Sequence, residues 1–331
     1  MHHAVKYHWN QLLIALRHAW QNGSIFFMLA GLVLLPVWFY PHIQLKSTVQ
    51  DTLFVIDISE SMNVRDVDYP SPQTSRIELA KLSVRDAMAS LPCGSRVSIG
   101  LFAGDEVTVL FEPLEVCQHF PAIEQVISKI NTNMRWVGDS WIIRALISSI
   151  KEAHKRKLNL VMVTDADEMP HRSAPRLTEL LELKEKVNGL LLGVGNEAPQ
   201  PIPKLDGNHQ IIAYWTREEA VLEGNHPNLL AYVKALTPGE AIPEGLLDEV
   251  GEHLSAFNQP LMFSVAQSAA MQAAHIKTPN DAIKSLNIND FKKEAIAERD
   301  ARWLFGLTSA ILILIGWFWE PISILLKTKH S

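Results

Sequence analysis

Two aspartates in this sequence each end an apolar run, and two serines follow the first of them. Asp57 ends TLFVID and precedes Ser59 and Ser61 at alternate positions, which gives the pattern Asp-x-Ser-x-Ser. Asp165 ends a second run, LNLVMVTD. A carboxylate and two hydroxyls that leave a strand at alternate positions can point to one spot. Such hard oxygen ligands favour Mg²⁺ or another hard divalent cation, with water completing its coordination.

The same residues allow two other interpretations. In the first, Ser59 and Ser61 only cap a helix and Asp57 merely ends a strand. In the second, Asp57 is the nucleophile of a phosphotransferase of the haloacid dehalogenase type. That chemistry needs an acid two residues later, where Ser59 cannot serve. No general base or nucleophile pair is evident beside the pattern. We therefore expect a binding protein and not an enzyme.

Composition narrows the class of protein. The chain has 331 residues, 47% of them hydrophobic, and a formal net charge of −6. These values exclude a disordered protein, and the lack of a basic stripe argues against nucleic acid as a partner. Two cysteines exclude a disulfide-rich scaffold, and no Cys-x-x-Cys pair indicates zinc.

The candidate ligands require strands that end at one edge of a sheet. Apolar runs predict strands at 52–57, 95–102, 107–111, 158–165, 187–195 and 211–215. Helical patterns alternate with them at 76–91, 120–131, 141–156, 174–186 and within 246–273. This alternation predicts an α/β fold with a doubly wound, mostly parallel sheet and one antiparallel edge strand. Such sheets bind ligands at the carboxyl ends of their strands.

Two apolar stretches near the chain ends predict transmembrane helices at 24–41 and 303–326. Both are long enough for a bilayer core and have aromatic residues near their ends. A buried core helix is the alternative for each, and a cleaved signal peptide is the alternative for the first. Both alternatives are disfavoured, because the stretches are apolar on every face and no small-x-small cleavage site follows the first.

Lys and Arg near these spans predict their orientation. Residues 1–23 and 327–331 carry basic residues and no acidic ones, so both ends are expected in the cytoplasm. The first segment has apolar residues at helical spacing, which predicts an amphipathic helix on the inner membrane face or a helical extension of the anchor. The acidic part between the spans is then periplasmic, in a bacterial inner-membrane protein, with a domain over 46–285 and a connector over 286–302.

Several of these features together resemble the von Willebrand factor A (VWA) domain and its metal-ion-dependent adhesion site. They are the apolar strand before Asp-x-Ser-x-Ser, Gly138-Asp139-Ser140 opening a helix, and Thr164-Asp165 closing a strand. The resemblance implies five metal ligands: Asp57, Ser59, Ser61, Ser140 and Asp165. It also implies Mg²⁺, or Ca²⁺ or Mn²⁺, as the cation. Because only two of the ligands are charged, the cation could accept one more carboxylate, from a partner protein.

The chain departs from the family pattern at three places near this site. Glu60 stands where glycine is common, Asp139 replaces a glycine, and Ala166-Asp167 replaces Gly-Glu. Asp139 and Asp167 add carboxylates. A possible rim for the partner consists of Trp136, Asp139, Asp167 and Glu168. For Glu168 a solvated loop is the simpler interpretation.

Longer stretches resemble two branches of the family. FVIDISESMNVRDVDYPSPQTSRIELAK resembles membrane-anchored VWA proteins of the aerotolerance (Bat) type, whereas LPCGSR, FEPLEVC and RWLFGL look more like VWA proteins of methanol-oxidation gene clusters (MxaL type). The second resemblance implies an assembly or calcium-loading factor for a periplasmic metalloenzyme such as methanol dehydrogenase, which would present an acidic residue. The alternative is an envelope stress complex with other membrane VWA proteins and a MoxR-like AAA+ ATPase.

The two cysteines flank the predicted hairpin. Cys93 precedes the strand at 95–102 and Cys117 follows the strand at 107–111, at nearly equal distances from the turn near residue 105. Cross-strand neighbours lie close enough for a disulfide after a small adjustment, and an oxidising periplasm would allow one. We therefore predict a Cys93–Cys117 bond, with two buried thiols as the alternative.

Overall fold

The computed structural model describes residues 18–20, 22–39, 42–168, 177–216, 219 and 253–319. The chain forms two compact units. One is Thr48–Ala295, and the other joins the two ends of the chain, Met1–Ser47 and Ile296–Ser331.

A central sheet organises the unit Thr48–Ala295. Its strands follow the order β12-β7-β6-β2-β3-β4, and β5 also pairs with β3. All neighbours are parallel except β4 and β5, which run antiparallel to β3. The bounds are β2 (Thr52–Asp57), β3 (Arg96–Ala103), β4 (Glu106–Val109), β5 (Leu114–Glu115), β6 (Asn159–Thr164), β7 (Gly189–Gly193) and β12 (Gln272–His275).

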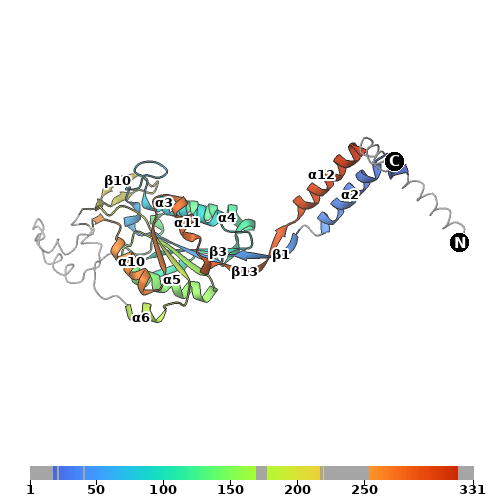
Figure 1. Ribbon diagram of the computed structural model, residues 1–331. Coiled ribbons are helices and arrows are strands. Elements are labelled where there is room, and N and C mark those ends of the chain that lie inside the picture. Colours follow the sequence, from blue (N-terminus) through green and yellow to red (C-terminus); the bar gives the residue numbers. More distant parts are fainter. Residues whose placement is uncertain are drawn as a thin grey trace, which may run out of the picture. The chain divides into compact units, whose positions relative to one another are not determined.

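Helices cover both faces of this sheet, as Figure 1 shows. One face packs against α3 (Arg76–Ala89), α4 (Val116–Lys129) and α11 (Pro279–Leu286). The other face packs against α5 (Ile142–Arg156), α6 (Leu177–Glu182) and α10 (Gln259–Ser268).

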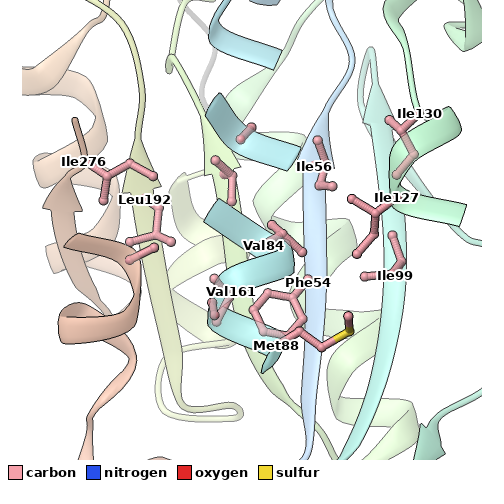
Figure 2. Close-up of a cluster of buried hydrophobic side chains, with 14 of the residues drawn as sticks. Phe54, Ile56, Val84, Met88, Ile99, Ile127, Ile130, Val161, Leu192 and Ile276 are labelled. Carbon is pink, nitrogen blue, oxygen red and sulfur yellow. The ribbon is translucent and has the colours of Figure 1, made fainter. Parts of the chain in front are cut away.

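The central strand β2 is buried along its whole length because both of its faces are covered. Phe54 and Ile56 point to the α3 side, where Figure 2 shows them among Val84 and other buried side chains. Leu53 and Val55 alternate with them and pack on the α5 side. The apolar run Leu53–Ile56 is therefore what a strand in this position needs, and β2 places the carboxylate of Asp57 at its carboxyl end.

The predicted α/β class and the mostly parallel sheet are confirmed. The carboxyl-terminal part of the domain contains two elements that were not predicted, β12 and α11, and both add to the main fold. The strand predicted at 211–215 is β10 (Ile211–Tyr214). It pairs with β9 (Pro203–Leu205) and lies outside the main sheet.

A ribbon of two strands belongs to the segments that lead into and out of the domain. β1 (His42–Val49) pairs with β13 (Lys293–Asp300). The predicted connector 286–302 therefore contains a strand, β13. This pairing joins residues about 250 positions apart, so no local pattern could reveal it.

Two helices make up the described core of the other unit. α2 (Ser24–Phe39) and α12 (Arg302–Trp317) lie side by side (Figure 1), and Oγ of Ser309 donates a 3.2 Å hydrogen bond to the carbonyl oxygen of Ala30. The rings of Phe26 and Trp319 have centroids 4.7 Å apart. Among the described residues, no helix has both the length and the apolar character that a membrane crossing requires.

Parts of the predicted membrane topology fall outside the described residues. They are 1–17, 40–41 and 320–326, together with the tail 327–331.

Candidate metal centre

Asp57 is placed by the sheet itself. It is the last residue of β2 and is fully buried. Its pairing partner in β3 is Phe102, and the preceding residue, Ile56, pairs with Val163 of β6. The backbone N–H of Ser59 donates to its Oδ1 at 2.8 Å, and the hydroxyl of Thr164 donates to its Oδ2 at 2.6 Å. These two bonds fix the orientation of the carboxylate.

The two serines of the Asp-x-Ser-x-Ser pattern lie close together in the turn after β2. The Oγ atoms of Ser59 and Ser61 are 2.9 Å apart, and both residues are buried. Ser59 stands at the amino end of a short 3₁₀ helix, Glu60–Asn63, but its side chain makes no capping hydrogen bond there. The geometry therefore disfavours the alternative in which the serine hydroxyls serve only as caps.

Ser140 reaches the same edge of the sheet from the loop before α5. It pairs with Gly104, which follows β3: the N–H of Gly104 donates to the carbonyl oxygen of Asp139 at 2.8 Å, and the N–H of Trp141 donates to that of Gly104 at 2.9 Å. Gly104 has a φ of +69°, and a Cβ there would lie 2.5 Å from Val137. Glycine is thus required where this loop docks.

The hydroxyl of Ser140 is a buried polar atom without a hydrogen-bond partner among the described residues. Leaving a buried hydroxyl unpaired costs free energy, so such an atom needs an explanation. A metal ligand is one, and Ser140 is the residue that the sequence assigns to the fourth metal contact.

Asp165 follows β6 and is fully buried. Its Oδ1 accepts a 3.1 Å hydrogen bond from the N–H of Asp167, and its Oδ2 accepts one of 2.8 Å from Nη1 of Arg76. Sequence analysis missed Arg76, because it begins a helix 89 positions away and no local pattern marks it as buried.

Negative charge accumulates at this edge. Burial, followed by the repulsion from Asp165, raises the pKa of Asp57 to about 7. The same two causes raise the pKa of Asp167 to about 8. A divalent cation would offset the repulsion among these carboxylates. The donor set of carboxylate and hydroxyl oxygens therefore fits a hard divalent cation.

The four residues of the predicted rim differ in their surroundings. Trp136 is exposed and Asp139 is half-buried, whereas Asp167 is buried, and its Oδ2 lacks a hydrogen-bond partner among the described residues. Burial is the largest influence on the pKa of Glu168 and raises it, while the N–H groups of Ile143 and Ile142 donate to its carboxylate and act against this. Glu168 thus caps the amino end of α5.

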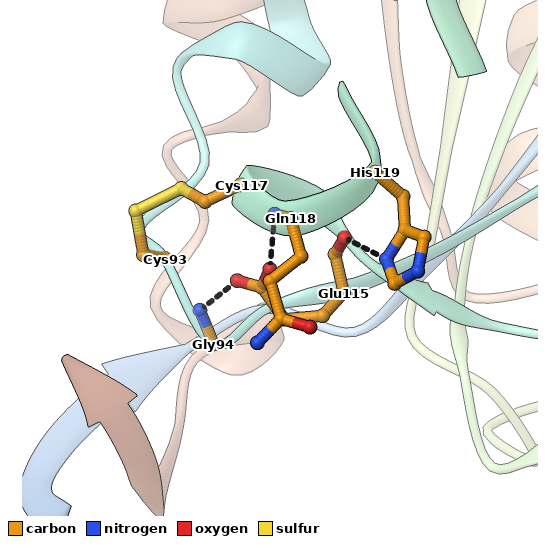
Figure 3. The surroundings of a disulfide bond; sticks show 6 residues. All are labelled: Cys93, Gly94, Glu115, Cys117, Gln118 and His119. Carbon is orange, nitrogen blue, oxygen red and sulfur yellow. Dashed lines mark hydrogen bonds between the residues drawn. A yellow bond between two sulfur atoms is a disulfide. The ribbon is translucent and has the colours of Figure 1, made fainter. Parts of the chain in front are cut away.

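A second group of possible ligands surrounds the cysteines (Figure 3). Cys93, Glu115 and Cys117 bring potential ligand atoms within 4.8 Å of one another. The two thiols are consumed, however, by a Cys93–Cys117 disulfide with Cα atoms 5.3 Å apart. Glu115 accepts hydrogen bonds from the N–H groups of Gly94 and Gln118. This cluster is a covalent brace between the start of β3 and the first turn of α4.

A cavity of about 430 Å³ lies away from the five predicted ligands. Four basic side chains line it: Arg65, Lys81, Lys129 and His209. Lys81 pairs with Glu78, which also lines the cavity. None of the five predicted metal ligands contributes to its wall.

Comparisons with known proteins find one matching family model and several similar solved structures. Residues 52–168 match the model of the von Willebrand factor type A domain. No curated protein matches the chain. Three similar solved structures are BatB from Bacteroides thetaiotaomicron, an aerotolerance-related membrane protein from Bacteroides fragilis, and manganese-loaded TRAP from Plasmodium vivax.

The similarity to these structures is remote. Sequence identity is 16%, 16% and 15%, and TM-scores are 0.49, 0.48 and 0.37. The matches cover 72%, 72% and 78% of this chain and 95%, 96% and 81% of the other chains. The matched family model and the sheet that carries the Asp-x-Ser-x-Ser turn lead to one conclusion. Residues 52–168 of this chain form a von Willebrand factor type A domain.

Proposed function

We propose that this chain binds a divalent cation through a metal-ion-dependent adhesion site and, through that cation, a carboxylate of a protein partner. The ligands are Asp57, Ser59, Ser61, Ser140 and Asp165. One observation carries the proposal: the buried hydroxyl of Ser140 lacks a partner among the described residues, at the sheet edge where two buried carboxylates repel each other.

The chemistry of these ligands favours recognition over catalysis. A bound Mg²⁺, or Ca²⁺ or Mn²⁺ in its place, would supply a coordination position for an incoming carboxylate. Other residues of the chain hold the ligands in place. Thr164 and the N–H of Ser59 fix the carboxylate of Asp57, and Gly104 holds the loop that carries Ser140. We propose a binding protein and not an enzyme.

Exposed apolar side chains in the loop before Ser140 support a protein partner. Met134, Trp136 and Val137 are 46%, 44% and 43% exposed. An apolar patch with an aromatic residue beside a polar centre is the arrangement that protein interfaces use, because apolar contacts add affinity and the polar centre adds specificity.

We also propose that α2 and α12 anchor the chain in a bacterial inner membrane and that the VWA domain lies in the periplasm. Many large apolar side chains of these helices are exposed, among them Leu32, Trp38, Leu307 and Trp317. Exposed apolar surface of this extent needs a cover, and lipid provides one. The Cys93–Cys117 disulfide suits an oxidising compartment outside the cytoplasm.

As the client we propose a periplasmic metalloenzyme, with methanol dehydrogenase as the named candidate and assembly or calcium loading as the task. The support is the resemblance of LPCGSR, FEPLEVC and RWLFGL to the methanol-oxidation branch of the family. The alternative is a Bat-type envelope complex with other membrane VWA proteins and a MoxR-like ATPase. Its support is the resemblance of the longer run around Asp57.

Cation binding is tested first, by thermal unfolding of the full chain in detergent after removal of metal with a chelator. Mg²⁺ at 100 times its dissociation constant should stabilise the wild type by about 2.7 kcal/mol. Asp57→Ala should fold but lose this response, and Asp290→Ala, at an exposed site, should keep it. An Asp57→Ala variant that responds like the wild type would refute the site.

Partner capture then separates the two proposed roles. Wild-type and Asp57→Ala proteins are crosslinked in intact cells of the native host, purified, and their partners identified by mass spectrometry. A periplasmic metalloenzyme recovered only with the wild type supports cation-dependent client binding. Membrane VWA proteins and an ATPase, recovered equally with both, support the envelope complex and argue against a role for the cation.

A further inference from the structure

Arg76 is the first residue of α3, and its side chain is fully buried beside the candidate metal centre. Its guanidinium uses all five of its N–H donors. Nε and Nη2 donate to the carboxylate of Asp66, at 3.1 and 2.7 Å. Nη1 donates to Oδ2 of Asp165 at 2.8 Å and to Oγ of Ser255 at 2.6 Å, and Nη2 also donates to the carbonyl oxygen of Ser255 at 3.2 Å.

The backbone around Arg76 is shaped to hold this side chain. Gly195 has a φ of +103°, and a Cβ at that position would lie 2.4 Å from Nε of Arg76. The N–H of Asn196 donates to Oδ2 of Asp66 at 2.9 Å. The N–H of Asn258 donates to the carbonyl oxygen of Asp165 at 2.9 Å. Segments distant in sequence thus converge on the guanidinium of Arg76 and its aspartate partners.

Asp165 therefore has two cationic partners in the proposed metal-bound state. It is the fifth ligand of the proposed metal site, and it already carries the ion pair with Arg76, in which both side chains have no exposed surface. Two cations that share one buried carboxylate repel each other, and the repulsion is strong where solvent does not screen it. Arginine remains protonated, so it cannot escape the conflict by losing its charge.

We propose that Arg76 is an internal counter-ion that competes with the divalent cation for Asp165 and so sets the affinity of the metal centre. This inference rests on the function proposed above. Without the metal, Arg76 neutralises Asp165 and stabilises the fold. With the metal, Asp165 is shared, and part of the binding free energy is lost to repulsion between the two cations.

The proposal predicts the sign of an effect that a merely structural residue would not produce. If Arg76 only braces the site, removing it should misplace Asp165 and weaken metal binding. If Arg76 competes, removing it should weaken the metal-free fold and yet strengthen metal binding. The two roles are thus separated by the direction in which the affinity changes.

The experiment measures Mn²⁺ binding by isothermal titration calorimetry on the full chain in detergent, after removal of metal with a chelator. Arg76→Met should bind Mn²⁺ at least about tenfold more tightly than the wild type, because the substitution removes a positive charge from the site. Arg76→Lys keeps the charge and should stay within about threefold of the wild type. Unfolding without metal should occur at a lower temperature in Arg76→Met.

Arg96→Met is the matched control. Arg96 also pairs with a buried aspartate, Asp51, but at the opposite end of β2. Its removal should lower stability and leave the Mn²⁺ affinity unchanged. Equal or weaker Mn²⁺ binding by folded Arg76→Met would overturn the proposal.

A second variant keeps the test decisive if Arg76→Met does not fold. Asp66→Asn removes the carboxylate that shares Arg76 with Asp165. Arg76 then acts on Asp165 alone, so Mn²⁺ affinity should fall about threefold or more. An unchanged affinity in Asp66→Asn would contradict the competition.

Failure of the inference and failure of the proposed function give different results. If neither wild type nor Arg76→Met binds Mn²⁺, both are overturned. If only Arg76→Met binds, the competition is supported, but the wild-type chain does not use the site as proposed.

Discussion

The hydroxyl of Thr164 donates a 2.6 Å hydrogen bond to Oδ2 of Asp57, and it ties together the ends of two neighbouring strands at the candidate metal centre. Thr164 ends β6 and Asp57 ends β2. Its Oγ1 also accepts from the N–H of Ala166 at 2.9 Å, so it sets the turn that carries Asp165. One hydroxyl thus positions both of the proposed acidic ligands.

Thr164→Val should destabilise the fold by about 1–3 kcal/mol, because Asp57 and the N–H of Ala166 both lose a buried partner. Equilibrium unfolding in urea measures this difference. Thr108→Val is the control, since Thr108 is exposed on the edge strand β4 and its replacement should change stability by less than about 0.5 kcal/mol. Equal effects of the two substitutions would contradict the role of Thr164.

Ser140→Ala should leave the metal-free protein at least as stable as the wild type, because its buried hydroxyl has no described partner to lose. Metal binding should weaken about tenfold or more, since one ligand is gone. Ser83→Ala is a close match: the hydroxyl of Ser83 is equally buried and unpartnered among the described residues, but it lies within α3. Titration calorimetry with Mg²⁺ should find Ser83→Ala unchanged, and a loss of affinity in both variants would count against the assignment of Ser140.

Asp51 gives the fold a defined dependence on pH. Burial alone would raise the pKa of Asp51, but hydrogen bonds from Lys293 and Arg96 outweigh it and lower the pKa below the ordinary value of 3.8. An acid with a lowered pKa in the folded state stabilises the protein above its unfolded pKa, and this stabilisation disappears as the pH falls through the folded value.

Asp51→Asn should therefore cost about 1–3 kcal/mol at pH 7. The cost should remain the same at pH 5 and shrink below about pH 4. Urea unfolding of both proteins at pH 7, 5 and 3 tests this. A cost that grows as the pH falls would show that the sign is wrong.

The disulfide should contribute to stability independently of the metal centre. Cys93 and Cys117 are 24 positions apart, and closing a loop of this length stabilises a fold by about 3 kcal/mol through the unfolded chain. The double variant Cys93→Ser, Cys117→Ser should lose about this amount in urea unfolding and keep its response to Mg²⁺. Loss of the Mg²⁺ response in a folded double variant would instead show that the brace supports the site.

The sheet and the predicted ligands could be recognised from local patterns. Residues 53–56 before Asp57 are all apolar because β2 is covered on both faces, and Asp57 follows where the strand ends. In contrast, β12 has the sequence QAAH, which carries no strong strand signal and owes its place to pairing with Leu190–Gly193 of β7. The burial of Arg76 likewise depends on Asp165 and Ser255, which are 89 and 179 positions away.

The positions at which the chain enters and leaves the domain determine how the domain would respond to a pulling force. Asp51, just before β2, is bonded to Lys293 at the start of β13, so entry and exit meet at the amino end of the central strand. Asp57 stands at the opposite end of that strand. A force on a partner bound at Asp57 would load β2 along its length, in shear against β3 and β6. The hydrogen bonds between these strands would then bear the force together and would not break one after another. The partner proposed to bind at Asp57 would therefore be held by a strand that is loaded along its length.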